Sequence, residues 1–145
     1  MQLDHAWIAA HIPHQGAMCL LDEVLEWDAT EIECRTATHR LKSNPLRTLD
    51  HLKAICAIEY AAQAIAVHGA VNAASPGVGP GMLASVRAVD LYADRLDDLV
   101  GDLIVRAVRI GGDETALLYH FSVSSDRLLL ASGRGTILLR NRSIS

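Results

Sequence analysis

The chain has 145 residues, of which 50% are apolar and 21% are charged, and its formal net charge at pH 7 is −4. A chain of this length can bury a sizeable core by itself, so we expect a single domain over residues 1–145. The acidic balance and the scattered positions of Lys and Arg argue against a nucleic-acid-binding protein, whereas small molecules and acidic carrier proteins stay open as partners.

The cysteines and the N-terminus bear on the compartment. Cys19, Cys34 and Cys56 are an odd number without paired spacing, and each lies in an apolar run where a thiol packs as a small hydrophobic side chain. The N-terminus lacks a basic stretch followed by an apolar one, and no apolar run reaches the ~20 residues that span a bilayer. We therefore expect a cytoplasmic protein that is neither secreted nor inserted in a membrane.

The first third of the chain predicts a short helix followed by two strands. Residues 4–11 can form one or two helical turns. Residues 20–27 and 32–37 have the β character of two successive strands.

A long apolar helix over residues 51–71 follows the two strands. Asp50 is the expected N-cap, because its side-chain oxygen can accept from the free N–H groups of the first turn. Asn72 and residues 77–81 are expected to end the helix. At ~1.5 Å per residue the helix would be roughly 30 Å long, and an apolar helix of that length must be covered by other elements.

Four strand-like runs after the helix can supply this cover: residues 82–92, 102–110, 116–124 and 128–139. Gly111-Gly112-Asp113 and Ser125-Asp126 are short turn signals between the last three runs, which predicts antiparallel hairpins. The predicted class is α+β, with a curved antiparallel sheet wrapped around one long central helix, as in the hotdog fold.

Glu59 is the most unusual residue of the predicted helix. It and Gln63 are the only strongly polar side chains among the fourteen residues 54–67. Burial of a carboxylate disfavours its charged form, so a buried Glu59 would have a raised pKa and would suit a general acid near neutral pH. Otherwise Glu59 and Gln63 form a narrow polar stripe that faces solvent or another subunit.

Three motifs, in the same order along the chain, resemble the 3-hydroxyacyl-acyl-carrier-protein dehydratases of type II fatty-acid synthesis. In these dehydratases the three motifs are a Pro-His segment before an apolar strand, Glu-Ala-x-Ala-Gln on the central helix, and Gly-Asp after Val-Pro. The matching residues here are Ile12-Pro13-His14, Glu59-Tyr60-Ala61-Ala62-Gln63 and Leu99-Val100-Gly101-Asp102.

A second set of residues is similar to the dehydratase-like proteins encoded beside aryl polyene and related polyketide-type synthases. It consists of Asn44-Pro45-Leu46-Arg47, residues 58–64 and His68-Gly69. The resemblance implies a hotdog fold and dehydration of 3-hydroxyacyl thioesters on an acyl carrier protein to trans-2-enoyl thioesters, in fatty-acid or aryl polyene-type biosynthesis. We expect no cofactor.

The resemblance also implies roles for individual residues. In these dehydratases a histidine from one subunit and a glutamate from the other face the substrate across a tunnel at the dimer interface. Glu59 matches the glutamate and would protonate the departing hydroxyl. Gln63, one helical turn later, would orient the carboxyl or the hydroxyl. Asn44 stands nearest the family histidine and, with His14, is expected to bind substrate.

The family's His-Phe-Pro-Gly motif is missing, and Ser43-Asn44-Pro45-Leu46 stands in its place. An amide cannot act as a base, so another group must remove the C2 proton. His39, His51 and His14 are candidates. His51 lies ~12 Å along the helix from Glu59 and could reach it only from a second subunit. His68 lies on the opposite helix face from Glu59, which favours a capping or packing role.

This departure leaves two alternatives to an active dehydratase. The chain could be the non-catalytic partner subunit of a heterodimeric dehydratase, or an acyl thioesterase in which a carboxylate activates water. A single sheet around one helix leaves a sheet edge and a helix flank exposed, so we expect a homodimer or a heterodimer with another hotdog dehydratase. The spacing of His and Cys predicts no metal site, and no nucleotide-binding loop is found.

Overall fold

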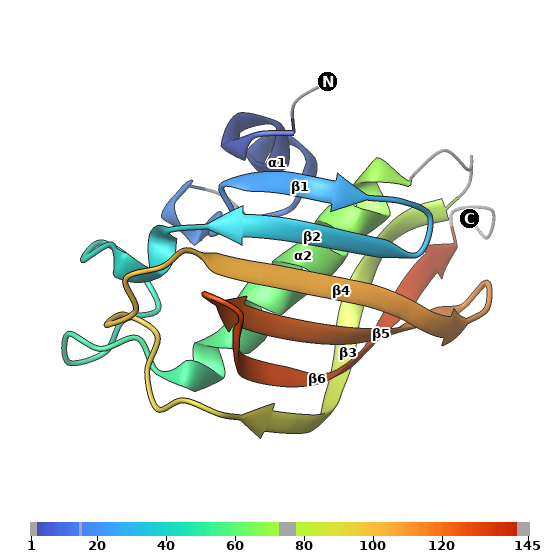
Figure 1. Ribbon diagram of the computed structural model, residues 1–145. Helices are drawn as coiled ribbons and strands as arrows, with labels where there is room; N and C mark the ends of the chain where they lie inside the picture. The colour runs from blue at the N-terminus through green and yellow to red at the C-terminus, as the bar shows by residue number, and fades with distance from the viewer. Residues whose placement is uncertain (1–2, 15, 73–77, 142–145) are drawn as a thin grey trace.

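The computed structural model describes residues 3–14, 16–72 and 78–141 of the chain. One antiparallel sheet of six strands, in the order β1-β2-β4-β5-β6-β3, dominates it (Figure 1). The strands are β1 (Glu23–Trp27), β2 (Glu31–Thr36), β3 (Val78–Leu91), β4 (Leu103–Gly112), β5 (Ala116–Ser125) and β6 (Leu128–Asn141). The helices are α1 (His5–His11) and α2 (Ala57–Val71), with short 3-10 turns at Gly16–Met18, Thr38–Arg40 and Ala54–Cys56.

Helix α2 packs diagonally across one face of the sheet, with contacts to β2, β3, β4 and β5 (Figure 1). Its small residues Ala57, Ala61 and Ala64 are buried and allow close approach to the strands. Alternate residues of the strands face it, among them Phe121 of β5. A Cβ added at Gly133 of β6 would lie 2.6 Å from the Phe121 ring, so this glycine leaves space for the aromatic core. The predicted hotdog fold is confirmed.

The segment Ala54–Val71 is long and apolar enough to pass as a membrane span by length and composition. Half of it is buried inside the protein, beneath the sheet. A buried core helix passes the same test, so this finding is weak evidence for a membrane.

The predicted start of the long helix is wrong by several residues. Asp50 has φ 66 and lies in a turn, and α2 begins only at Ala57 after a single 3-10 turn. The preceding backbone is used elsewhere: the Leu52 N–H donates to Asp97 Oδ1 at 2.8 Å and the Ala54 N–H to the Asp94 carbonyl at 3.1 Å. The 15 residues of α2 therefore span roughly 22 Å instead of 30 Å.

Most of the other predicted elements are confirmed within a few residues. Helix α1 is present and Asp4 caps it, accepting from the Trp7 N–H at 3.0 Å. Strands β4, β5 and β6 form the predicted antiparallel meander. The first strand starts at Glu23 and not at residue 20, because Leu20 donates its N–H to the α2 side chain Gln63 instead of to a strand. Asn72 ends α2 as predicted, whereas residue 77 of the predicted stop lies outside the described residues.

His68 fastens the end of α2 to the sheet, which confirms the predicted packing role. Its ring is buried, with Nε2 2.8 Å from the Asp28 carbonyl and Nδ1 2.6 Å from Tyr119 Oη. Because a carbonyl can only accept, Nε2 carries the proton and Nδ1 accepts from the tyrosine hydroxyl. One neutral imidazole thus joins α2 to the β1–β2 turn and to β5.

We expect the protein to lose stability as the pH falls below about 6.5, the ordinary pKa of an unfolded histidine. Burial lowers the pKa of His68 and of His39 in the folded chain, so the unfolded state binds more protons in this range. The free energy of unfolding, measured with urea between pH 7.5 and 5, should keep the full contribution of these histidines above pH about 6.5 and decline as the pH falls below that value. His68→Gln, which keeps a donor and an acceptor, should decline less steeply. Equal slopes in the two proteins would contradict a role for His68.

Candidate active site

Glu59 lies in the first turn of α2, where the partial positive charge of the helix N-terminus stabilises a carboxylate. Its side chain is 35% exposed. In this chain by itself Glu59 is therefore not deeply buried, because the sheet covers only one flank of the helix. A carboxyl in this position can be reached by a ligand.

His14 meets Glu59 within the same chain. Its Nε2 lies 3.2 Å from Glu59 Oε1, and its side chain is 24% exposed. His14 comes from the loop between α1 and the 3-10 turn Gly16–Met18, directly after Pro13. Its other ring nitrogen, Nδ1, is buried and finds no hydrogen-bond partner among the described residues. The structure thus brings together two of the residues singled out in the sequence.

Gln63 is fully buried beneath the segment that leads from His14 to β1. Its Nε2 donates to the Met18 carbonyl at 2.7 Å, and its Oε1 accepts from the Leu20 N–H at 2.8 Å. It is therefore no solvated helix residue, and its amide is engaged by backbone groups and not by Glu59. A substrate contact of Gln63 stays a prediction, while its observed contacts fasten this segment to α2.

Asn44 is buried on the loop after β2, and its amide is also hydrogen-bonded within the protein. Its Nδ2 donates to the Thr38 carbonyl and to Tyr60 Oη, both at 3.0 Å, and its Oδ1 accepts from the Leu46 N–H at 2.9 Å. The contact is made to Tyr60, the residue after Glu59, and not to Glu59. Substrate binding by Asn44 likewise stays a prediction.

A chain of hydrogen bonds continues from Tyr60 and was not foreseen from the sequence. Since Tyr60 Oη accepts from Asn44, its hydroxyl can donate to Thr38 Oγ1 at 2.8 Å, and Thr38 donates in turn to the Leu20 carbonyl at 2.7 Å. Burial raises the pKa of Tyr60, which keeps the hydroxyl neutral. The signal that could have found it is a tyrosine inside an otherwise apolar helix, since a buried hydroxyl requires partners.

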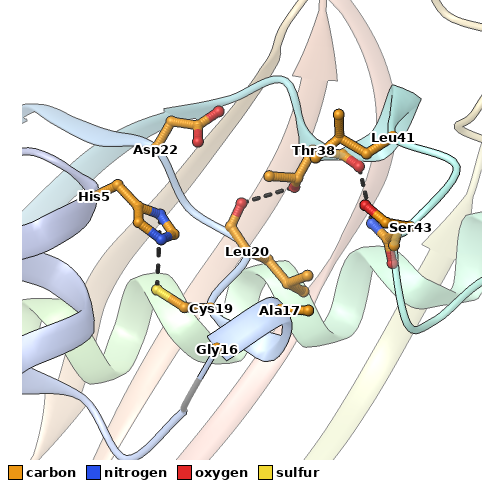
Figure 2. Close-up of a pocket in the computed structure, with 10 residues that line it drawn as sticks. His5, Gly16, Ala17, Cys19, Leu20, Asp22, Thr38, Leu41 and Ser43 are labelled. Atoms are coloured by element: carbon orange, nitrogen blue, oxygen red, sulfur yellow. Dashed lines mark hydrogen bonds between the residues drawn. The ribbon is translucent and has the colours of Figure 1, made fainter.

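A cavity of about 280 Å³ lies between this network and the N-terminal segment (Figure 2). Figure 2 shows Thr38 and Ser43 on one side and His5, Cys19 and Asp22 on another. Asn44 also lines it, whereas His14 and Glu59 do not. The Asp22 carboxylate accepts from the Ala37 N–H at 2.7 Å, so it too is engaged by backbone.

The remaining histidines lie away from Glu59. His39 is buried, with Nε2 3.1 Å from the Leu99 carbonyl, and His51 is an exposed neighbour of Asp97 at 3.9 Å. His68 holds the far end of α2. The other three are engaged elsewhere or exposed: His5 at the Leu21 carbonyl, His11 at the Trp7 carbonyl, and His120 on β5. Within residues 3–14, 16–72 and 78–141 no group of three or more His, Cys, Asp or Glu could hold a metal ion.

Comparison with known proteins places the chain in a family. A model of the ApeP-like proteins, described as ApeP dehydratase, matches residues 6–141. The chain belongs to the ApeP-like dehydratase family. No curated protein sequence matches it. The sequence resemblance to aryl polyene dehydratases is thereby confirmed, and membership makes the chain a dehydratase, that is, a hydro-lyase.

Solved structures share the fold of this family member at low sequence identity. One is the dehydratase heterocomplex ApeI:P from Xenorhabdus doucetiae, with 22% identity, a TM-score of 0.79, and coverage of 94% of this chain and 92% of that chain. Another is a thioesterase from Haemophilus influenzae, with 12% identity, a TM-score of 0.63 and coverage of 82% and 78%. The PaaI protein from the phenylacetic acid degradation operon of E. coli has 10% identity, a TM-score of 0.65 and coverage of 92% and 88%.

Replacement of Gln63 by Leu should destabilise the protein by about 2 kcal/mol or more, because the buried Leu20 N–H and Met18 carbonyl would lose their partners. Urea unfolding measures the difference. Glu59→Gln, a change at a partly exposed position of the same helix face, is the control and should cost less than about 1 kcal/mol. A Gln63→Leu protein as stable as this control would show that the amide does not fasten the segment.

Proposed function

We propose that this ApeP-like dehydratase removes water from 3-hydroxyacyl thioesters carried on an acyl carrier protein and yields trans-2-enoyl thioesters. Family membership supplies the reaction class. The observation that carries the proposal to this chain is the Glu59 carboxyl, which lies partly exposed on an otherwise apolar helix and contacts an imidazole.

The chemistry requires an acid at the hydroxyl. The thioester carbonyl acidifies the proton at C2, but a hydroxyl at C3 leaves poorly unless it is protonated as it departs. Glu59 would supply that proton. The apolar residues that surround it on α2 would exclude water and strengthen its interaction with the substrate.

The biological setting is also part of the proposal. Membership in the ApeP-like family and similarity to the ApeI:P dehydratase heterocomplex support a role in aryl polyene-type biosynthesis, and a second hotdog subunit as partner. The chain would act in the cytoplasm, with Cys19, Cys34 and Cys56 as free thiols. The thioesterases among the structural neighbours share 12% identity or less with this chain and support the fold alone.

Intact-protein mass spectrometry of a 3-hydroxyacyl carrier protein tests the proposal. With the wild-type chain, alone or with its hotdog partner subunit, the carrier should lose the mass of one water. Glu59→Gln should lower the rate by roughly 10²-fold or more, the usual contribution of a general acid. Glu26→Gln on β1, where the side chain is exposed, is the matched control and should behave as wild type.

Two other outcomes would contradict the proposal. Release of free carrier thiol without a new double bond would identify a thioesterase. Undiminished water loss by a complex that contains the Glu59→Gln chain would identify this chain as a non-catalytic partner.

A further inference from the structure

A base for the C2 proton is the missing half of the proposed reaction, and the following inference rests on that reaction. We infer that His14 of this chain is the base, so that one subunit carries both the acid and the base. The observation is the contact of 3.2 Å between His14 Nε2 and Glu59 Oε1. Acid and base act on the adjacent carbons C3 and C2, so they must lie close together.

The other histidines do not fit this role. His39 and His68 are buried and bonded to the Leu99 and Asp28 carbonyls, and burial lowers the pKa of both. His51 contacts Asp97, and His120 alternates with the inward-facing Tyr119 and Phe121, which places it on the sheet face away from α2. Of the seven histidines, all of them in the described part of the chain, His14 alone contacts Glu59.

The accessibility of His14 also fits this role. Its side chain and that of Glu59 are each partly exposed, so a thioester can approach both. Nδ1 has no hydrogen-bond partner among the described residues, so no such bond fixes the tautomer of the ring. Nε2, the nitrogen that faces Glu59, is the atom that would accept the C2 proton.

Two protons move in the reaction, and the pair ends with the same number of protons with which it began. The step requires that Glu59 carry the proton that it donates and that His14 present a free lone pair on Nε2. His14 takes the C2 proton, the electrons of that C–H bond form the C2–C3 double bond, and the C3–O bond breaks. The departing hydroxyl takes the Glu59 proton and leaves as water. His14 then returns its proton to Glu59 across the 3.2 Å contact, which restores the starting state without a co-reactant.

Substitution of His14 in the complete protein, with its hotdog partner present where the wild type needs it, tests the inference. His14→Asn should lower the rate of water loss by roughly 10²–10⁴-fold. It should also remove the acidic limb of the pH–rate profile, the limb on which protonation of the base abolishes activity. A merely structural role would not alter the shape of this profile. His120→Asn is the matched control and should match wild type in both measurements.

The outcomes separate this inference from the proposed function. If His14→Asn loses water from the substrate at a rate within about twofold of wild type while Glu59→Gln is inactive, His14 is not the base. The proposed dehydratase function would still hold. No water loss by the wild type, even with its partner, overturns both. Thermal unfolding of His14→Asn and of a second variant, His14→Gln, verifies the fold, and a folded variant with an unaltered pH profile counts against the inference.

Discussion

The whole structure depends on the need to cover an apolar helix. Helix α2 is too apolar to face water, and one sheet can cover only the flank that it faces. The chain covers part of the remaining surface with the segment between α1 and β1, which contributes the buried residues Ile12, Leu20 and Leu21. This segment has little regular structure, so its backbone N–H and carbonyl groups need partners from elsewhere. The Gln63 side chain accepts from one backbone N–H of the segment and donates to one of its carbonyls. A polar residue thus satisfies backbone groups that would otherwise be buried without partners.

The same arrangement sets the spacing of the candidate site. Glu59 and Gln63 lie four residues apart and therefore share a helix face, roughly 6 Å apart along the axis. The segment between α1 and β1 that covers α2, the covering segment, runs alongside the helix in the same direction. His14 contacts Glu59, and the later residues Met18 and Leu20 contact Gln63, one turn further along α2. Gly16, with φ 57, begins the single turn between the two contacts. The amide that fastens the segment therefore lies one helical turn after the carboxyl that the imidazole contacts.

Much of this fold is predictable from the sequence, because strand alternation and turn residues are local signals. The β4–β6 meander follows from the glycines and aspartates between its strands, and the apolar run 54–67 indicates the central helix. The start of that helix is not predictable in this way: Asp50 is a good N-cap by residue type, but Asp94 and Asp97, more than forty residues later, engage the backbone after it. The site shows the same division. Glu59 is conspicuous because it is a charge in an apolar run, whereas its contact with His14 depends on how a loop crosses the helix, and no local pattern encodes that crossing.

The loop after β2 uses Asn44 for structural hydrogen bonds. Asn44 stands nearest the histidine of the dehydratases resembled in sequence, and here it closes a hydrogen-bonded chain through Tyr60 and Thr38 to the Leu20 carbonyl. An imidazole could not reproduce the two N–H bonds that Asn44 donates from a single nitrogen, together with the bond that its oxygen accepts from Leu46. The loop is therefore built to support the same N-terminal segment that Gln63 fastens from the other side. The proposed catalytic pair of His14 and Glu59 is consistent with a structural asparagine on this loop, because a site with its base on the covering segment would need none here.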